Sequence, residues 1–177
     1  MELWCTDPVA AKQQYGPIAS WNTSEITSMA LLFINKTNFN GDISRWDVSS
    51  VTHMGYMLDG ATSFNCDLSQ WNVSNVTNMY CMLRGATSFN GDLSQWDVSN
   101  VTNMTSMLKN ATSFNGDLSQ WDVSNVTSMS HTLQGATSFT HQLGGAWSTS
   151  TAVKNWMFMN CPGSIAGKTN NADGTPE

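Results

Sequence analysis

Charge is scarce in this chain: Asp, Glu, Lys and Arg together make up 11% of its 177 residues, against roughly a quarter in an average soluble domain. Only seven residues are Lys or Arg and the net charge is −6, so the chain lacks the clustered basic surface that nucleic acids and anionic membranes require. It also lacks the long apolar run of a membrane-spanning helix. We therefore expect no nucleic-acid partner and no membrane insertion.

Motifs of catalysis are missing as well. The three histidines, His53, His131 and His141, share no spacing with a Ser or Cys nucleophile. The sequence has no glycine-rich phosphate loop, no C-x-x-C metal motif and no H-E-x-x-H motif. We expect a protein that is not an enzyme and that needs no cofactor and no metal ion.

Most polar residues of the chain are uncharged: serine, threonine and asparagine account for 59 of the 177 residues. The chain is nevertheless 40% hydrophobic and has eight Trp, which is enough to bury a core and excludes a disordered polar polymer. Its length fits one domain of ordinary size.

An internal repeat of 25 residues organises the sequence. Three kinds of apolar residue recur with this period: Trp21, Trp46, Trp71, Trp96 and Trp121; Phe39, Phe64, Phe89, Phe114 and Phe139; and Met29, Met54, Met79, Met104 and Met129. A period this short is typical of stacked units that bury their apolar faces against their neighbours, so we expect Trp96 to stack between Trp71 and Trp121. We divide the chain into an N-terminal cap (1–20), five repeats (21–145), a C-terminal cap (146–165) and a flexible tail (166–177).

Within one unit the apolar spacing changes. Residues 95–99 alternate polar and apolar, which predicts a short strand. Met104, Met107, Leu108 and Ala111 then have the spacing of one helix face. Thr102 is the expected N-cap of that helix. The expected fold class is an α/β repeat, namely a right-handed leucine-rich-repeat-like solenoid with a short parallel β-strand and a short helix in each 25-residue coil, capped at both ends.

The unit W-D-V-S-N-V-T-N-M-x-x-M-L-x-x-A-x-x-F-N-x-D-L-S-x resembles the repeat of the BspA-like leucine-rich-repeat surface proteins, over residues 21–147. The resemblance implies a leucine-rich-repeat-like solenoid and attachment to host or matrix proteins at a cell surface. It implies no catalytic residue, because that family has no defined catalytic motif.

Polar residues recur as well, in two columns of Asp. The first column, Asp42, Asp67, Asp92 and Asp117, lies in a turn where Asp commonly accepts a backbone N–H two residues on, so we expect a structural role. The second column follows the buried Trp, and we expect it and its neighbours to form a ligand-binding ladder on the concave face of the sheet. The candidate site residues are Arg45, Asp47, Ser49, Gln70, Asn72, Ser74, Gln95, Asp97, Ser99, Gln120, Asp122 and Ser124. A weak Ca²⁺ site between neighbouring carboxylates is an alternative use of the ladder, although carboxylates about 5 Å apart repel by less than about 1 kcal/mol in water and need no metal.

Three functions fit these features. The favoured one is a non-catalytic binding or adhesion module that recognises a protein or glycan through the repeated polar face. A lattice binder such as an ice-binding protein would instead use the Thr columns at 27, 52, 77, 102 and 127 and at 37, 62, 87, 112 and 137. Two expectations argue against the lattice binder: the first Thr column is expected to cap helices, and the second is expected to lie on the helix side of the coils. A structural subunit packed within a larger assembly is the third.

We expect an extracellular or cell-surface protein. Residues 1–20 are too polar for a signal peptide, so any signal would lie outside this sequence. Cys5 and Cys161 lie about five coils apart, on the order of 25 Å, which is beyond the reach of a disulfide, so we expect no bridge within the chain; a bond between molecules through an end cysteine stays open.

Overall fold

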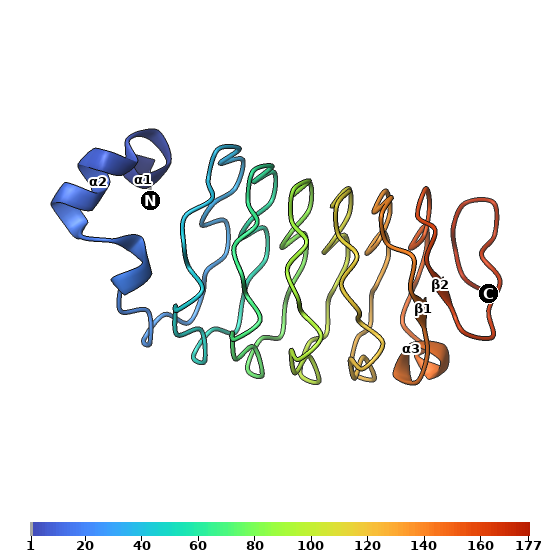
Figure 1. The fold of residues 1–177 in the computed structure, drawn as a ribbon. Helices are drawn as coiled ribbons and strands as arrows, with labels where there is room; N and C mark the ends of the chain where they lie inside the picture. The colour runs from blue at the N-terminus through green and yellow to red at the C-terminus, as the bar shows by residue number, and fades with distance from the viewer. Residues whose placement is uncertain (1) are drawn as a thin grey trace.

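The structure is a computed structural model that describes residues 2–177, and it consists of a helical N-terminal cap followed by a row of coils standing side by side (Figure 1). The chain begins with helices α1 (Glu2–Thr6) and α2 (Pro8–Tyr15) and a 3₁₀ turn at Ile18–Ser20. It ends with strand β1 (Gln142–Leu143), helix α3 (Ala146–Thr149) and strand β2 (Ser164–Ile165). β1 and β2 pair in parallel and form a two-stranded sheet.

The expected strand and helix of each coil are absent. Residues 21–141 contain no helix and no strand longer than an isolated parallel bridge. The bridges join equivalent positions of neighbouring coils, namely Ser28, His53, Asn78, Asn103, Ser128 and Val153. The predicted α/β, leucine-rich-repeat-like solenoid of strand plus helix per coil is therefore wrong, and the coils are built from turns.

A ribbon of consecutive β-turns occupies the segment for which a helix was predicted. In residues 104–111, every second backbone N–H closes a turn within the coil: Met107 donates to Met104 (3.0 Å), Lys109 to Ser106 (3.2 Å) and Ala111 to Leu108 (3.1 Å). The N–H groups in between donate to carbonyls of the next coil, from Met104, Ser106, Leu108 and Asn110 to Ser128, Ser130, Thr132 and Gln134. Turns and coil-to-coil bonds thus share the backbone donors alternately, so none of these seven is left unpaired.

The ribbon requires two left-handed residues in each coil. In the fourth coil these are Ser106 (φ 58°) and Asn110 (φ 59°), and Gly85 (φ 69°) is the equivalent of Asn110 one coil earlier. Left-handed residues other than glycine are uncommon, so a ribbon that needs them was not expected from the sequence. The apolar spacing by itself therefore favoured a helix. Thr102 caps no helix, because its hydroxyl donates instead to the carbonyl of Thr77 in the preceding coil (3.1 Å).

The core consists of aromatic columns that run along the stack. Trp96 lies between Trp71 and Trp121 with ring centroids 6.4 Å apart and planes 3° from parallel on both sides, which confirms the predicted column. Its indole Nε1 also donates to the carbonyl of Leu68 in the preceding coil, at 2.9 Å. Neighbouring coils whose backbones hydrogen-bond to each other lie about 4.8 Å apart, whereas the Trp rings are 6.4 Å apart. The coils are therefore farther apart on the Trp side of the stack than on the hydrogen-bonded side.

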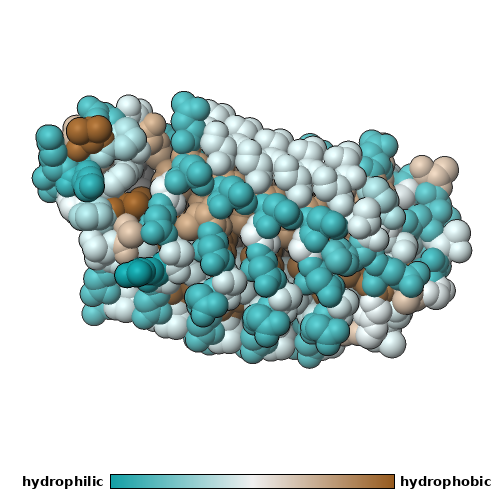
Figure 2. Space-filling view, viewed as in Figure 1, coloured by the Kyte–Doolittle hydropathy of each residue, from teal (hydrophilic) through white to brown (hydrophobic). Residues whose placement is uncertain are grey.

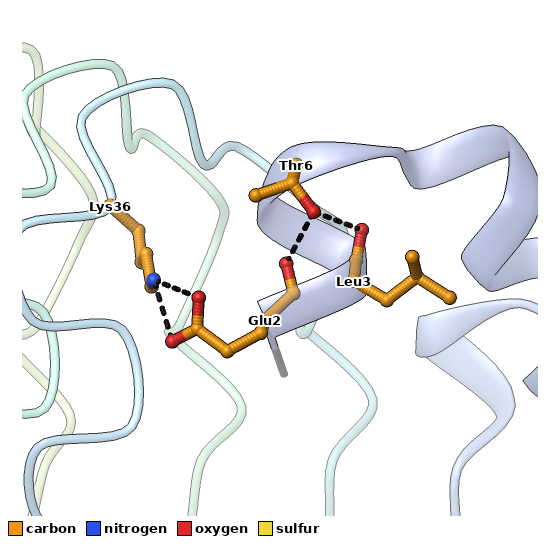
Figure 3. A network of polar contacts seen from close by, with 4 residues as sticks. All are labelled: Glu2, Leu3, Thr6 and Lys36. Atoms are coloured by element: carbon orange, nitrogen blue, oxygen red, sulfur yellow. Dashed lines mark hydrogen bonds and ion pairs between the residues drawn. The ribbon is translucent and has the colours of Figure 1, made fainter.

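The N-terminal cap is joined to the first coil by an ion pair. Lys36 Nζ lies 2.6 and 2.8 Å from the two carboxylate oxygens of Glu2, while the hydroxyl of Thr6 donates to the carbonyl of Glu2 within α1 (Figure 3). Asp7 caps α2 by accepting the N–H of Ala10. Among residues 2–177, no helix has both the length and the apolar character that crossing a membrane requires.

The segment predicted to be a flexible tail lies against the last coil. Its backbone folds back on itself between Thr169 and Glu177. Gly174 and Thr175 accept the N–H groups of Phe158 (2.8 Å) and Trp156 (2.9 Å), which have no further coil to bond to.

Candidate functional site

The second Asp column lies on the surface, in turns that follow each buried Trp. Asp47, Asp97 and Asp122 are exposed, and each accepts the backbone N–H of the serine two residues on at 3.0 Å. Ser49 also donates its hydroxyl to Asp47, at 2.6 Å. Because no strand forms here, the ladder does not occupy a concave sheet face; it lies next to the Trp column, on the side of the stack where the coils are farther apart.

Asn72 shows that this column does not depend on charge for its local structure. It replaces Asp in the third repeat, and its Oδ1 accepts the N–H (3.2 Å) and hydroxyl (2.7 Å) of Ser74 in the same way. Asn22 accepts the N–H and hydroxyl of Ser24 likewise, so the turn geometry is shared by all five coils, while the charge is shared by three.

The first Asp column has the same geometry. Its Oδ1 atoms accept the N–H of the serine two residues on, in the pairs Asp42 with Ser44, Asp67 with Ser69, Asp92 with Ser94 and Asp117 with Ser119. The structural role predicted for this column is confirmed. The sequence analysis missed that the candidate site column has the same role, although the shared D-x-S pattern was a visible signal.

Hydrogen bonds from serine keep these carboxylates ionised. The pKa of Asp97 lies below its usual value, chiefly because the hydroxyl and the N–H of Ser99 stabilise the charged form. The Asp122 carboxylate in the next coil opposes this effect by raising the pKa of Asp97 slightly. The surface therefore presents carboxylates that remain charged at neutral pH, with repulsion acting on Asp97 from the neighbouring Asp122.

The glutamine column flanks the buried Trp on its other side. Gln70, Gln95 and Gln120 are exposed, and each side-chain amide donates to the serine before it at 3.2–3.3 Å. Arg45 is also exposed and stands at the same position of the first repeat. The structure thus brings the candidate residues together as parallel columns, with hydrophilic side chains forming rows across the coils in Figure 2.

Asparagine ladders are functional candidates that the sequence analysis missed. The side-chain amides of Asn75, Asn100 and Asn125 donate to the carbonyls of Ser49, Ser74 and Ser99 in the preceding coil, at 2.7–2.8 Å. They are exposed and stand beside the serines of the candidate site. Their recurrence every 25 residues was the available signal.

Threonine forms two further ladders. The hydroxyls of Thr52, Thr77, Thr102 and Thr127 each donate to the carbonyl of the Thr one coil earlier, at 3.0–3.2 Å. Those of Thr62, Thr87, Thr112 and Thr137 do the same at 3.2–3.4 Å. Neither column caps or flanks a helix, so the two arguments that counted against a lattice binder do not hold.

The polar columns of the candidate site are not lined up with a metal-binding cluster or with any of the hollows described below. In residues 2–177, no group of three or more His, Cys, Asp or Glu side chains is placed to hold a metal ion. The four cysteines are free thiols. Hollows occur instead at the N-terminal end, including one of about 420 Å³ between α1 and residues 38–41 and one of about 330 Å³ beside Trp21 and Ile26.

Comparison with known proteins gives one family. A family model described as Mycoplasma protein of unknown function, DUF285, matches the chain twice, at residues 7–111 and at residues 70–167. The two matches overlap, as expected for a tandem repeat whose units can replace one another in an alignment. A search of the curated proteins found no match.

Proposed function

The chain belongs to the family described as Mycoplasma protein of unknown function, DUF285, and on the geometry of its repeated surface we propose that it is a non-catalytic binding or adhesion module. It acts at a cell surface or outside the cell, and it recognises a protein or glycan through the polar columns beside the Trp column. The resemblance of its unit to the repeat of BspA-like surface proteins supports this location.

The observation that carries the proposal is that successive coils present the same polar groups in the same geometry. Asp97 and Asp122, with Gln95 and Gln120 beside them, are exposed and held by the same local hydrogen bonds. A ligand that spans several coils gains from effective concentration, because each further contact forms within a complex that already exists. Such a surface favours extended or repetitive ligands over small molecules.

The test is a binding screen of the whole protein against a glycan array and a panel of immobilised extracellular-matrix proteins. The informative variant carries Asp47→Asn, Asp97→Asn and Asp122→Asn, which keeps the turn acceptors, as Asn72 does, and removes the charge. The matched control carries Asp42→Asn, Asp92→Asn and Asp117→Asn in the other column. We expect the ligand to be lost by the first variant and retained by the control; equal binding by both variants would contradict the proposed face.

The Thr ladders support a second candidate function, lattice binding. Both columns repeat without interruption over five coils, and most of their side chains are exposed. Eight of the ten hydroxyls donate to a carbonyl of the preceding coil, so their oxygens still accept hydrogen bonds from ordered water. Thermal hysteresis and ice shaping by the purified protein would establish this function, and their absence would exclude it.

A further inference from the structure

The first coil has an open hydrogen-bonding edge. Within the stack, carbonyls at four alternate ribbon positions of each coil accept N–H groups from the coil before it, as His53 accepts from Met29 and Met57 from Phe33. The equivalent carbonyls of the first coil are those of Ser28, Ala30, Leu32 and Ile34. No group of residues 2–177 donates to any of the four.

Apolar surface accompanies this edge. Leu31 is 53% exposed and Ile26 is 42% exposed, and the hollow of about 330 Å³ is lined by Ile26, Leu32 and the indole of Trp21. The contacts of α1 and α2 with the first coil instead involve Lys36, the hollow at residues 38–41 and Trp21. Figure 2 shows apolar atoms on the surface between the helical cap and the coils.

The last coil has the complementary set of groups. By the 25-residue period, the N–H groups of Lys154, Trp156, Phe158 and Asn160 would point toward a following coil. Two of them donate to Thr175 and Gly174 of the C-terminal segment, which stands in for that coil. Apolar side chains are exposed at this end too, namely Val153, Trp156 and Met159.

Exposed large apolar side chains thus mark the two ends of the molecule and not its middle. In residues 2–177 they are Val9, Tyr15, Ile26, Leu31, Val153, Trp156 and Met159. Edges with unpaired backbone groups are templates for pairing with another chain. The four carbonyls at one end and the four N–H groups at the other match in number and in spacing along the chain.

We propose that the Ser28–Ile34 edge of the first coil binds the last-coil ribbon of a second copy of this chain. Alternate N–H groups of the incoming ribbon donate to the open carbonyls, and its apolar side chains cover Leu31 and Ile26. The fit is specific to a turn ribbon of this repeat, because residues 31 and 35 are left-handed here as in every other coil. The Gly174–Thr175 contacts compete for the same donors, so a second copy offers this ribbon only when its C-terminal segment moves aside.

The experiment titrates the whole isotope-labelled protein with a synthetic peptide of residues 151–162, in which the four ribbon N–H groups are free. We expect saturable shifts of the backbone amide signals of Met29, Leu31, Phe33 and Asn35, which follow the four carbonyls. A peptide N-methylated at Trp156 and Phe158 keeps every side chain and loses two donors, and we expect its affinity to fall at least tenfold.

Two protein variants distinguish binding at this edge from nonspecific hydrophobic binding. Leu31→Asp changes an exposed residue of the edge and should abolish the shifts, whereas Val9→Asp changes the exposed Val9 of α2 and should leave them unchanged. Equal binding of the two peptides, binding that survives Leu31→Asp, or no binding of the unmethylated peptide would each overturn the proposal. None of these outcomes depends on the Asp and Gln columns, so the proposed binding function is tested separately.

Discussion

The indoles in the middle of the Trp column, those of Trp71, Trp96 and Trp121, contribute both packing and a hydrogen bond between coils. Trp96 is 3% exposed, stacks on two other indoles and donates to Leu68 of the preceding coil. Loss of one ring removes two stacking contacts and one of the two hydrogen bonds that the carbonyl of Leu68 accepts, the other coming from the N–H of Trp71. The column therefore couples neighbouring coils in a way that a single apolar side chain would not.

We predict that Trp96→Ala lowers the free energy of unfolding by about 3–5 kcal/mol, as expected for a large buried aromatic side chain. Trp96→Phe keeps a six-membered ring in the column and loses the N–H donor and the rest of the indole, so its cost should be smaller, about 1–3 kcal/mol. Equilibrium unfolding in denaturant measures both values. A loss below about 1 kcal/mol for the Ala variant would mean that the column contributes little to stability.

The aspartates of the candidate site predict how stability depends on pH. Serine hydrogen bonds depress the pKa of Asp47, Asp97 and Asp122 in the folded state. A carboxylate with a depressed folded-state pKa contributes stability above its unfolded pKa of about 3.9, and this contribution is lost as the pH falls through the folded pKa. We therefore expect the melting temperature to change little between pH 7 and 5 and to fall below about pH 4.

The variant with Asn at these three positions provides the control for that expectation. Asn accepts the same serine hydrogen bonds without titrating, as Asn72 already does in the third repeat. Because Asn lacks the contribution of the ionised carboxylate, the melting temperature of this variant at pH 7 should be lower than that of the unsubstituted protein, and its loss between pH 5 and 3 should be smaller. An equal loss at low pH would place the acid sensitivity in other groups.

At the scale of the element, the ribbon of turns depends on left-handed residues, and its glycines differ in surroundings. A Cβ at Gly85 (φ 69°) would lie 3.7 Å from the nearest atoms, those of Gly60, so only backbone strain opposes it. A Cβ at Gly135 (φ 71°) would overlap the side chain of Asn110. The two positions have the same backbone geometry and test strain and steric overlap separately.

We predict that Gly85→Ala destabilises the protein by about 1–2 kcal/mol, which is the cost of a left-handed L-residue. Gly135→Ala should cost more, because the Asn110 side chain must also move. The combination of Gly135→Ala with Asn110→Gly should recover most of that extra cost. Equal values for the two single variants, measured by denaturant unfolding, would show that Asn110 moves without cost.

The same segment shows what the sequence could and could not predict. Burial of Met104, Met107, Leu108 and Ala111 was predictable from their spacing, and all four are fully buried. A helix was the wrong element, because successive turns also bring residues three and four apart to one face. Only the left-handed conformation of Ser106 distinguishes the two, and serine gives no sequence signal for it.

For the site, the columns followed from the period, while their setting did not. The recurrence of Asp97, Gln95 and Ser99 every 25 residues was enough to predict that equivalent side chains line up. Their placement on a sheet was wrong because Trp96 is followed by a turn, closed by the N–H of Val101 on the carbonyl of Val98 (2.9 Å). The coil-to-coil bonds of Asn100 depend on this turn geometry and could not be inferred from residue types alone.

At the scale of the whole molecule, repetition makes recognition a property of the stack. Three consecutive repeats present nearly the same polar groups at the Asp, Gln and Ser positions of the candidate site. The binding free energy of a ligand that spans them should therefore be divided among several weak contacts. This distributed recognition is the central claim of the proposed function.

The most direct test takes the ligand from the binding screen and measures its affinity for variants in which one, two or three residues of the candidate site are substituted. Asp97→Asn alone, or Gln95→Ala alone, should weaken binding by less than tenfold, which is about 1.4 kcal/mol. The affinity should then fall with each further substitution, and the variant with Asn at Asp47, Asp97 and Asp122 should bind hardly at all. Complete loss of binding from one substitution would contradict distributed recognition and indicate a discrete site, and full binding by the triple variant would exclude this face.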